Sequence, residues 1–413
     1  MKPDVLILGA GAAGMMAAVT AAQAGCSVVL LERNDRPGRK IGITGKGRCN
    51  VTNACSLLND LIAAVPVNGR FLYSAFSGFM PQDTMDFFES NGVPLKIERG
   101  NRVFPVSDNA LDIVDALQNA CRRSGVKFRK GRAVALLCDG ARVTGVKTED
   151  GGLIQAEHYL IATGGKSYPL TGSTGDGYAL AAQAGHTVID PKPSLVPLGA
   201  HEGFCSELQG LSLRNVTLRA EDTQTHRTVF EEMGEMLFTH FGVSGPLVLS
   251  ASSHMRSMSP ERYVLHIDLK PALTHEQLDK RLVRDFTENA KKDYINSLGL
   301  LLPRKLIPVV ARRSGIKPSV KSNQITREQR AELVELLKDF TVTVTGFRPI
   351  EEAIVTSGGV KVSEVDPKTM RSKLVENLFF AGEVLDVDAY TGGFNLQIAF
   401  STGYAAGKNI RSK

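Results

Sequence analysis

Three glycines near the start of the chain have the spacing G-x-G-x-x-G, a pattern that can hold a phosphate. Gly9, Gly11 and Gly14 carry it, and they follow the apolar run Val5 to Leu8. In this pattern the first glycine permits a tight turn, the second lets the backbone approach a pyrophosphate, and the third lets a helix pack closely on a strand. The N-terminus of that helix offers free N–H groups and the positive end of its dipole. The predicted loop consists of Gly9, Ala10, Gly11, Ala12, Ala13 and Gly14.

Glu32 supplies the acidic residue that such a site needs. It follows a second apolar stretch, Ser27 to Leu31, and lies about twenty residues after the glycines, where a carboxylate can accept hydrogen bonds from ribose hydroxyls. A 2′-phosphate would meet the like charge of this carboxylate and is disfavoured. A glycine-rich surface turn is the alternative, but strand, helix, second strand and terminal acid all agree with a bound dinucleotide. This stretch by itself fits both FAD and NAD.

The composition is that of an ordinary globular protein. Its 413 residues are enough for two or three domains, and 43% of them are hydrophobic and 22% charged. No apolar run is long enough to cross a membrane, and the chain enters its first strand without a leader segment, so we expect a cytoplasmic protein with no membrane partner. The six cysteines lack metal-ligand spacing, and we expect free thiols and no metal site.

A polar segment rich in glycine, asparagine and arginine follows Glu32. Its glycines would let the backbone lie close to a flat or charged group, and its basic side chains could meet phosphate or the electron-rich edge of a flavin. The alternative is a surface loop with solvated basic residues. The residues that we predict to contact the cofactor here are Arg33, Arg39, Lys40, Thr44, Gly45, Gly47, Arg48, Cys49 and Asn50.

The segment Gly47 to Asn53, with the pattern Gly-Arg-Cys-Asn-x-Thr-Asn, resembles the signature of a bacterial flavoprotein family. That family includes aminoacetone oxidase and a bile-acid double-bond reductase, and it is similar to the wider group of glutathione-reductase-like FAD proteins. The resemblance runs along essentially the whole chain. It implies that FAD is the cofactor and that an insert interrupts the domain that binds it.

Several later segments are expected to reach the same cofactor. By the resemblance, the strand at Val134 offers backbone groups to the adenine, and the strand that ends at Thr163 returns to the main sheet. The acidic residue after the apolar strand that begins at Leu378 meets the ribityl chain. The last helix places its first N–H groups against the flavin N1–C2=O edge, where they stabilise negative charge. The residues concerned are Val134, Thr163, Gly164, Gly382, Glu383, Asp386, Gly393, Phe394, Asn395 and Leu396.

Together these elements predict an α/β fold: a Rossmann-like FAD-binding domain with an inserted β-barrel-like domain that itself carries a helical insert. In the first part, an amphipathic helix is expected at Phe71 to Gly92. A second is expected at Ala110 to Ser124, with Ser107 or Asp108 as its cap.

The pattern changes from Pro191 onward. Pro191, Pro193 and Pro197 indicate a linker, and short apolar stretches then predict strands. The predicted strands are 211–220, 235–239, 247–250 and 263–269, followed by a helical stretch at 273–340 and a strand at 341–344. The predicted domains are 1–190 with 346–413 for FAD binding, 191–270 with 341–345 for the β-rich insert, and 271–340 for the helical insert.

The helical insert carries most of the net charge. Residues 271–340 hold 14 Lys and Arg against 9 Asp and Glu, while the whole chain has a net charge of +6. A basic cluster can recruit nucleic acid or other phosphates. We prefer a solvated helical face, because no aromatic residues are interleaved for single-strand binding. The cluster consists of Arg312, Arg313, Lys317, Lys321, Arg327 and Arg330.

FAD implies an oxidoreductase. We favour NAD(P)H-dependent reduction of a conjugated C=C bond in a small organic substrate. NADH or NADPH would act as a transient reductant, because the chain carries one dinucleotide fingerprint. Two alternatives stay open: an oxidase of a small amine that releases hydrogen peroxide, and a flavoprotein that binds RNA through the basic helical insert. Tyr390 either donates a proton or packs, and neither a catalytic residue nor an oligomeric state is assigned.

Overall fold

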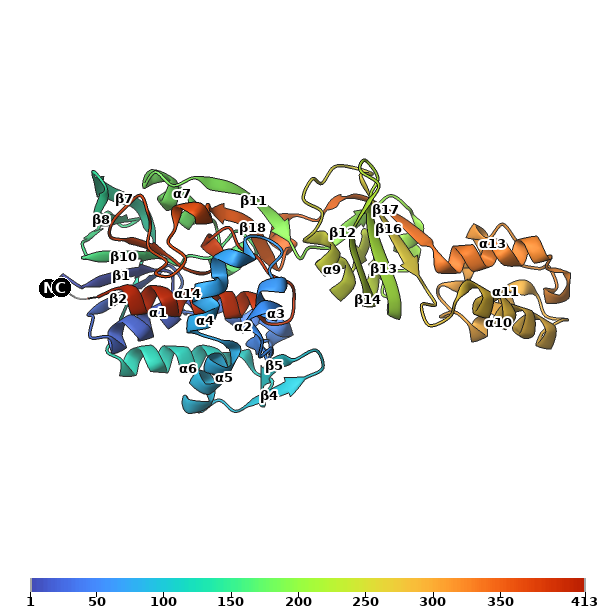
Figure 1. Ribbon diagram of the computed structural model, residues 1–413, viewed down its shortest axis with the longest axis horizontal. Coiled ribbons are helices and arrows are strands. Elements are labelled where there is room, and N and C mark those ends of the chain that lie inside the picture. The colour runs from blue at the N-terminus through green and yellow to red at the C-terminus, as the bar shows by residue number, and fades with distance from the viewer. Residues whose placement is uncertain (1, 412–413) are drawn as a thin grey trace. The chain divides into compact units, whose positions relative to one another are not determined.

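The computed structural model describes residues 2–411, and the chain divides into two compact units. Unit 1 comprises Met1–Ser194 with Pro349–Lys413, and unit 2 comprises Leu195–Arg348 (Figure 1). Each unit has its own hydrophobic core. The first and last parts of the sequence therefore form one unit, and the middle of the sequence forms the other.

A five-stranded sheet forms the centre of unit 1, in the order β19-β10-β1-β2-β6, and all its pairs are parallel. The predicted strand β1 (Val5–Leu8) is confirmed, and all four of its residues are buried. A strand with neighbours on both sides and helices on the faces needs such a continuous apolar run. The other strands are β2 (Val28–Glu32), β6 (Lys127–Lys130), β10 (His158–Ile161) and β19 (Leu378–Phe380).

The helices α1 (Ala12–Gln23) and α14 (Phe394–Asn409) pack against each other, so the two ends of the sequence meet in unit 1 (Figure 1). Glycines on α14 make the close approach feasible. A Cβ atom on Gly403 would lie 2.4 Å from the carbonyl oxygen of Ala13, and Gly407 repeats this arrangement one turn later. The other helices of unit 1 are α2 (Arg39–Ile43), α3 (Leu58–Ala63), α4 (Tyr73–Gly78), α5 (Pro81–Ser90), α6 (Ala110–Arg123) and α7 (Asp176–Gln183).

Three small antiparallel sheets complete unit 1. The first contains β3 (Thr52–Asn53), β5 (Arg102–Pro105) and β4 (Leu95–Glu98). The second contains β7 (Ala133–Asp139), β8 (Arg142–Thr148) and β9 (Leu153–Ile154). The third pairs β11 (Val188–Ser194) with β18 (Val355–Val360).

Unit 2 is built on a closed six-stranded antiparallel barrel, as the sequence predicts. Its strands alternate buried and exposed residues, because one face of each strand lines the barrel core. In barrel order the strands are β12 (Leu198–Ala200), β15 (Gly242–Ser244), β14 (Arg227–Thr239), β13 (Ser212–Asp222), β16 (Tyr263–Asp268) and β17 (Phe340–Phe347). Two short helices, α8 (Phe204–Glu207) and α9 (Pro246–Ser252), accompany them.

The predicted helical stretch lies between β16 and β17. Two of its helices begin with a capping box, in which Thr274 and Thr326 each accept a hydrogen bond from a backbone N–H three residues later. Their apolar faces pack together with the barrel residues in one core. The helices are α10 (His275–Glu288), α11 (Tyr294–Ser297), α12 (Ile307–Arg313) and α13 (Arg327–Lys338).

Some local predictions are wrong. The single helix expected at 71–92 is two helices, α4 and α5, because Phe79 is extended and Pro81 begins a new helix. The strand expected at 247–250 is helix α9, which begins at Pro246 and buries an apolar face. The cap of α6 is Asn109, which accepts a hydrogen bond from the N–H of Leu111. The expected linker at 191–197 is largely strand β11, whose prolines are tolerated in a sheet of only two strands.

Among the described residues, no helix is both long and apolar enough to cross a membrane.

Candidate cofactor site

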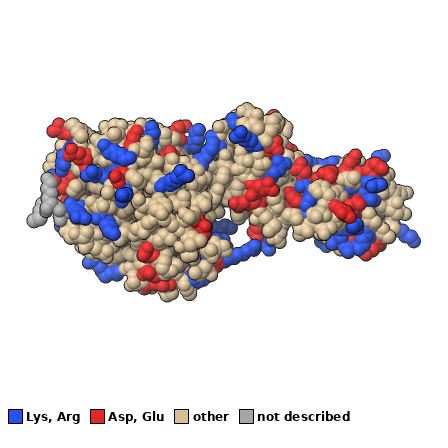
Figure 2. Space-filling model, viewed as in Figure 1, with Lys and Arg blue, Asp and Glu red and all other residues tan. Residues whose placement is uncertain are grey.

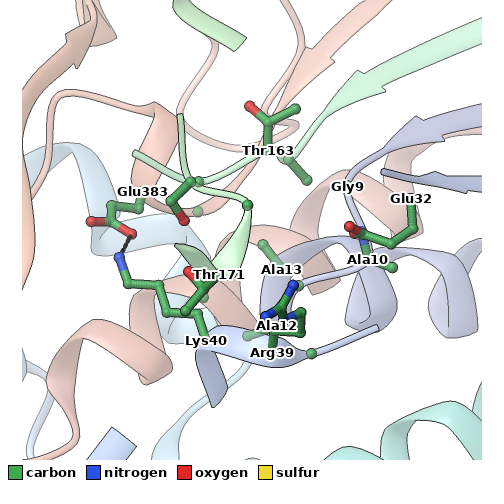
Figure 3. A pocket seen from close by; sticks show the side chains of 18 of the residues that line it. Gly9, Ala10, Ala12, Ala13, Glu32, Arg39, Lys40, Thr163, Thr171 and Glu383 are labelled. Atoms are coloured by element: carbon green, nitrogen blue, oxygen red, sulfur yellow. Dashed lines mark hydrogen bonds and ion pairs between the residues drawn. The ribbon is translucent and has the colours of Figure 1, made fainter. Parts of the chain in front are cut away.

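A cavity lies at the carboxyl ends of the parallel strands of unit 1 (Figure 3). Gly9, Glu32 and Thr163 line it from the ends of β1, β2 and β10, which are neighbours in the sheet. This edge, where the strand order reverses on either side of β1, is where open α/β sheets bind ligands. The predicted residues that line the cavity are Gly9, Ala10, Gly11, Ala12, Ala13, Glu32, Arg33, Arg39, Lys40, Thr44, Thr163, Gly164, Gly382, Glu383, Asn395 and Leu396.

The three fingerprint glycines have different surroundings. Gly9 has a φ of +102°, and a Cβ atom there would lie 2.6 Å from the carbonyl oxygen of Ala162. A Cβ atom on Gly14 would lie 1.9 Å from the carbonyl oxygen of Gly9, so this position needs glycine for the packing of α1 on β1. Gly11, by contrast, lines the cavity, and no atom lies within 4 Å of the position that its Cβ would take. The space beside Gly11 is therefore free to receive a pyrophosphate.

The Glu32 carboxylate is fixed at the edge of the cavity, beside Ala10 (Figure 3). Its Oε2 atom accepts a hydrogen bond from the N–H of Ala10 at 2.8 Å. Its Oε1 atom accepts two from Asn34, one from the backbone N–H and one from the side-chain amide, each at 2.8 Å. Since Oε2 has a single partner, it retains an acceptor position for a ribose hydroxyl.

Lys40 and Glu383 form an ion pair on another part of the wall (Figure 3). The Lys40 Nζ atom lies 2.7 Å from Glu383 Oε2 and donates a hydrogen bond to Ser167 Oγ at 2.6 Å. The Glu383 Oε1 atom accepts the N–H of Thr356 at 2.8 Å. Glu383 therefore lines the cavity as the partner of Lys40. The sequence predicted a contact between Glu383 and the ribityl chain but did not predict this ion pair.

A second set of charged residues, centred on Asp176 in the first turn of α7, also lines the cavity. Arg132 forms two hydrogen bonds with its carboxylate, at 2.8 and 2.9 Å, and Arg33 adds a third at 3.1 Å. Burial by itself would raise the pKa of Asp176, but the hydrogen bonds from Arg132 and Thr174 and the two positive charges outweigh it and lower the pKa. Arg33 and Arg132 are thus held at the cavity with an anionic partner.

The residues of the cavity fit a bound dinucleotide. The hydroxyl oxygen of Thr163 is buried and has no hydrogen-bond partner among the described residues, although this side chain lines the cavity. A buried hydroxyl normally has a partner. A ligand with many polar atoms would supply one, and the open space beside Gly11 has room for its phosphates.

The N-terminus of α14 also reaches the cavity, through Asn395 and Leu396. The Asn395 side chain closes the preceding loop, since its Oδ1 atom accepts the N–H of Ala389 at 2.9 Å and its amide donates to the carbonyl oxygens of Ala389 and Tyr390. Gly393, the cap residue, has a φ of +101°, and a Cβ there would lie 2.3 Å from Thr52 backbone atoms. Gly393 and Phe394 support this helix end without lining the cavity.

The whole Gly-Arg-Cys-Asn segment, from Gly47 to Asn53, lies outside the cavity lining. Arg48 forms ion pairs with Glu98 and Asp108, and its guanidinium lies 4.1 Å from the ring centroid of Phe104. Cys49 is buried, and burial raises the pKa of its thiol to about 12. Both residues hold the loop in place. The predicted residues that do not line the cavity are Gly14, Gly45, Gly47, Arg48, Cys49, Asn50, Val134, Asp386, Gly393 and Phe394.

Several residues that line the cavity were not predicted. The glycine-rich stretch that begins at Gly172 was a usable signal, but it fits a helix cap equally well. Arg132 and Ala133 precede or begin a strand and carry no local pattern. The main additions are Asn34, Gly131, Arg132, Ala133, Thr171, Gly172, Ser173, Asp176, Ile354 and Val355.

Comparison with known proteins identifies the relatives of this chain. A protein named "Ribosomal RNA dihydrouridine synthase" from Escherichia coli K12 is 34% identical over 98% of both chains. A protein named "3-dehydro-bile acid delta(4,6)-reductase" from Clostridium scindens is 30% identical over 97% of both chains. A 3-ketosteroid delta1-dehydrogenase from Sterolibacterium denitrificans, solved with 1,4-androstadiene-3,17-dione, covers 99% of both chains with a TM-score of 0.52 at 14% identity, which shows a shared fold.

The family described as "HI0933-like protein Rossmann domain" matches residues 3–409. This match and the two relatives confirm the resemblance that the sequence showed. With a glycine-rich cavity at the strand ends and with these relatives, the chain belongs to the HI0933-like Rossmann family and is an FAD-dependent oxidoreductase.

Proposed function

We propose that this protein reduces a C=C bond conjugated to a carbonyl group, with NADH or NADPH as the reductant. The observation that carries the proposal is the full-length similarity to a delta(4,6)-reductase of 3-dehydro bile acids. The name of the Escherichia coli relative points to the same type of bond, because dihydrouridine is uridine whose C5=C6 bond, conjugated to the C4 carbonyl, has been reduced. The names of these two relatives thus point to one type of bond in two different substrates.

The reaction adds a hydride to the β-carbon and a proton to the α-carbon, while NAD(P)H is oxidised to NAD(P)⁺. Bound FAD supplies the hydride transfer. The N-terminus of α14, fixed by Asn395, directs backbone N–H groups and the positive end of its dipole at the cavity, where they favour developing negative charge. The Lys40 ammonium group, held by Glu383, adds a fixed cation to the wall.

The sequence carries a single glycine-rich dinucleotide fingerprint, and in this proposal FAD binds there. A nicotinamide cofactor would therefore bind transiently, without a second Rossmann domain of its own. This arrangement is expected for an enzyme in which reductant and substrate take turns at the flavin.

A uracil ring within RNA is a second candidate substrate beside a small enone. It is favoured by the names of two relatives, the Escherichia coli protein and a Haemophilus influenzae protein that is 31% identical over 98% of both chains. Both substrates contain the same conjugated carbonyl system. They differ in size and charge, because RNA brings phosphates that must be held outside the catalytic cavity.

The test is an anaerobic titration of the FAD-loaded protein with NADH and with NADPH, followed through the visible absorbance of the flavin. Prompt bleaching, followed by reoxidation on addition of a 3-oxo-4-ene steroid or of a uridine-containing RNA, is the expected result. A flavin that neither nicotinamide reduces would refute the proposal. If a small amine bleaches it instead and hydrogen peroxide appears on exposure to oxygen, the protein is an oxidase.

A further inference from the structure

Three of the six residues in the basic cluster of the helical segment in unit 2 form ion pairs with acidic partners. Arg312 pairs with Glu207 at 2.8 Å and Lys321 with Asp293 at 2.7 Å. Arg330 likewise pairs with an aspartate of α10. On the face seen in Figure 2, acidic and basic side chains are interspersed over this segment. Half of the cluster is therefore paired with acids, and acidic side chains interrupt the positive charge on this face.

Three cations also converge on a hollow in the surface of unit 1. Lys368, Lys408 and Arg411 line it, and none of them forms an ion pair with a carboxylate in the part of the chain that the structure describes. No acidic side chain lines the hollow. The nearby Asp366 carboxylate accepts the backbone N–H groups of Lys368 and Thr369. The remaining lining residues are Tyr73, Ser74, Ser77, Gly78, Tyr404, Ala405 and Asn409.

Interior contacts fix the walls of this hollow. The Tyr404 ring stacks on Phe79 with centroids 4.7 Å apart. Asn409 donates hydrogen bonds to the carbonyl oxygen of Ala405 at 2.8 Å and to that of Lys368 at 3.4 Å, which ties the turn at 366–369 to the end of α14. The tyrosine at the rim, Tyr73, has 55% of its surface exposed. The backbone is thus anchored while the charges and one aromatic ring face solvent.

The hollow is separate from the cofactor cavity. The two share no lining residue. Along α14, Asn395 at the cavity and Tyr404 at the hollow are nine residues apart, which corresponds to about 14 Å at the rise of an α-helix. Lys408 lies in the last turn of α14, where a cation interacts favourably with the negative end of the helix dipole. Lys368 and Arg411 lie outside that helix, so the dipole does not account for their positive charges.

We propose that this hollow binds a single-stranded segment of RNA, with phosphates at the three cations and a base on Tyr73. Positively charged grooves with exposed aromatic rings are the way proteins hold single strands without reading their sequence. The inference rests on the second substrate candidate given above, since an RNA substrate must also be held beyond the flavin at which its uracil would react. The hydroxyl groups of Ser74 and Ser77 supply further donors for phosphate oxygens.

The test measures binding of a fluorescently labelled single-stranded RNA to the FAD-loaded full chain by anisotropy at several salt concentrations. Replacing Lys368 and Lys408 together by Gln is expected to weaken binding about tenfold or more and to reduce the slope of log K against log salt by about 1.4, two single-strand phosphate contacts. The matched control is K127Q/K147Q, which removes two exposed lysines elsewhere on unit 1 and should change neither quantity.

Tyr73→Ala separates stacking from charge. It is expected to weaken single-strand binding about fivefold without changing the salt slope, and to leave the weaker binding of a blunt RNA duplex unaltered. The assignment would be overturned if the hollow variants and the control variant lost RNA affinity equally, or if none of them lost it. Reduction of a small enone is measured in the same variants. A wild-type protein that reduces the enone but does not bind RNA at low salt overturns this inference alone, whereas failure of flavin reduction concerns the proposed function.

Discussion

Replacing Gly11 by Val tests the cofactor cavity most directly. Gly11 has φ −85° and ψ −167°, a conformation that any residue adopts, and the position of its Cβ is open. The variant should therefore fold. A valine side chain would fill the space beside the loop and prevent hydrogen bonds between the loop N–H groups and a pyrophosphate. Each such bond to a charged group contributes about 1.5–3 kcal/mol. The loss of two such bonds predicts FAD binding weaker by about 3–6 kcal/mol, or roughly 140-fold to 20,000-fold.

The assay is a fluorescence titration of the apoprotein with FAD, together with thermal unfolding of the apoprotein. Gly203→Val is the matched control, because Gly203 also has open space at its Cβ and an ordinary φ of −61° but lies in unit 2. Gly14→Ala is the opposite control. Its Cβ would overlap the carbonyl oxygen of Gly9 at 1.9 Å, so this variant should lose stability and not merely affinity. A folded Gly11→Val protein that binds FAD like the wild type would refute the placement of the pyrophosphate.

Three further predictions concern charges and thiols. Lys40→Met leaves the partly buried Glu383 carboxylate without its cation. The free energy of unfolding measured in urea should fall by about 1–3 kcal/mol, and K40M/E383Q should recover most of this loss. Equal stability of K40M and the wild type would contradict this expectation. The pKa of Asp176 is lowered in the folded state, so its ionised carboxylate stabilises the fold at pH values above the unfolded pKa of 3.8. This stabilisation is lost as the pH falls through the folded pKa, and Asp176→Asn should therefore flatten the acid side of the plot of unfolding free energy against pH. An unchanged plot would refute the assignment. Cys138 is exposed and should react with a thiol reagent in the native protein, whereas the buried Cys49 should react only after unfolding. Mapping of the labelled peptides distinguishes the two thiols. Labelling of Cys49 in the native protein would contradict its burial.

Much of unit 1 could be predicted because its signals are local. The apolar run Val5 to Leu8, the glycine spacing and the following alanine-rich helix lie within two dozen residues and need no distant partner to be recognised. Alternation of apolar residues likewise predicted four of the six barrel strands, since side chains in a strand point to opposite faces. Three of the four local failures involve a proline, such as Pro246, which begins helix α9 where a short apolar run suggested a strand.

The sequence by itself determined the glycine-rich loop, the acid at the end of the second strand and the overall α/β plan with an inserted barrel. Only the tertiary structure decided which charges face one another. Lys40 meets Glu383 across 343 positions of sequence. Arg312 in the basic cluster pairs with Glu207 across 105 positions, while Lys368 forms no ion pair among the described residues. Turns and short elements depend on neighbouring residues, but an ion pair depends on how distant segments cross, and no local pattern encodes that.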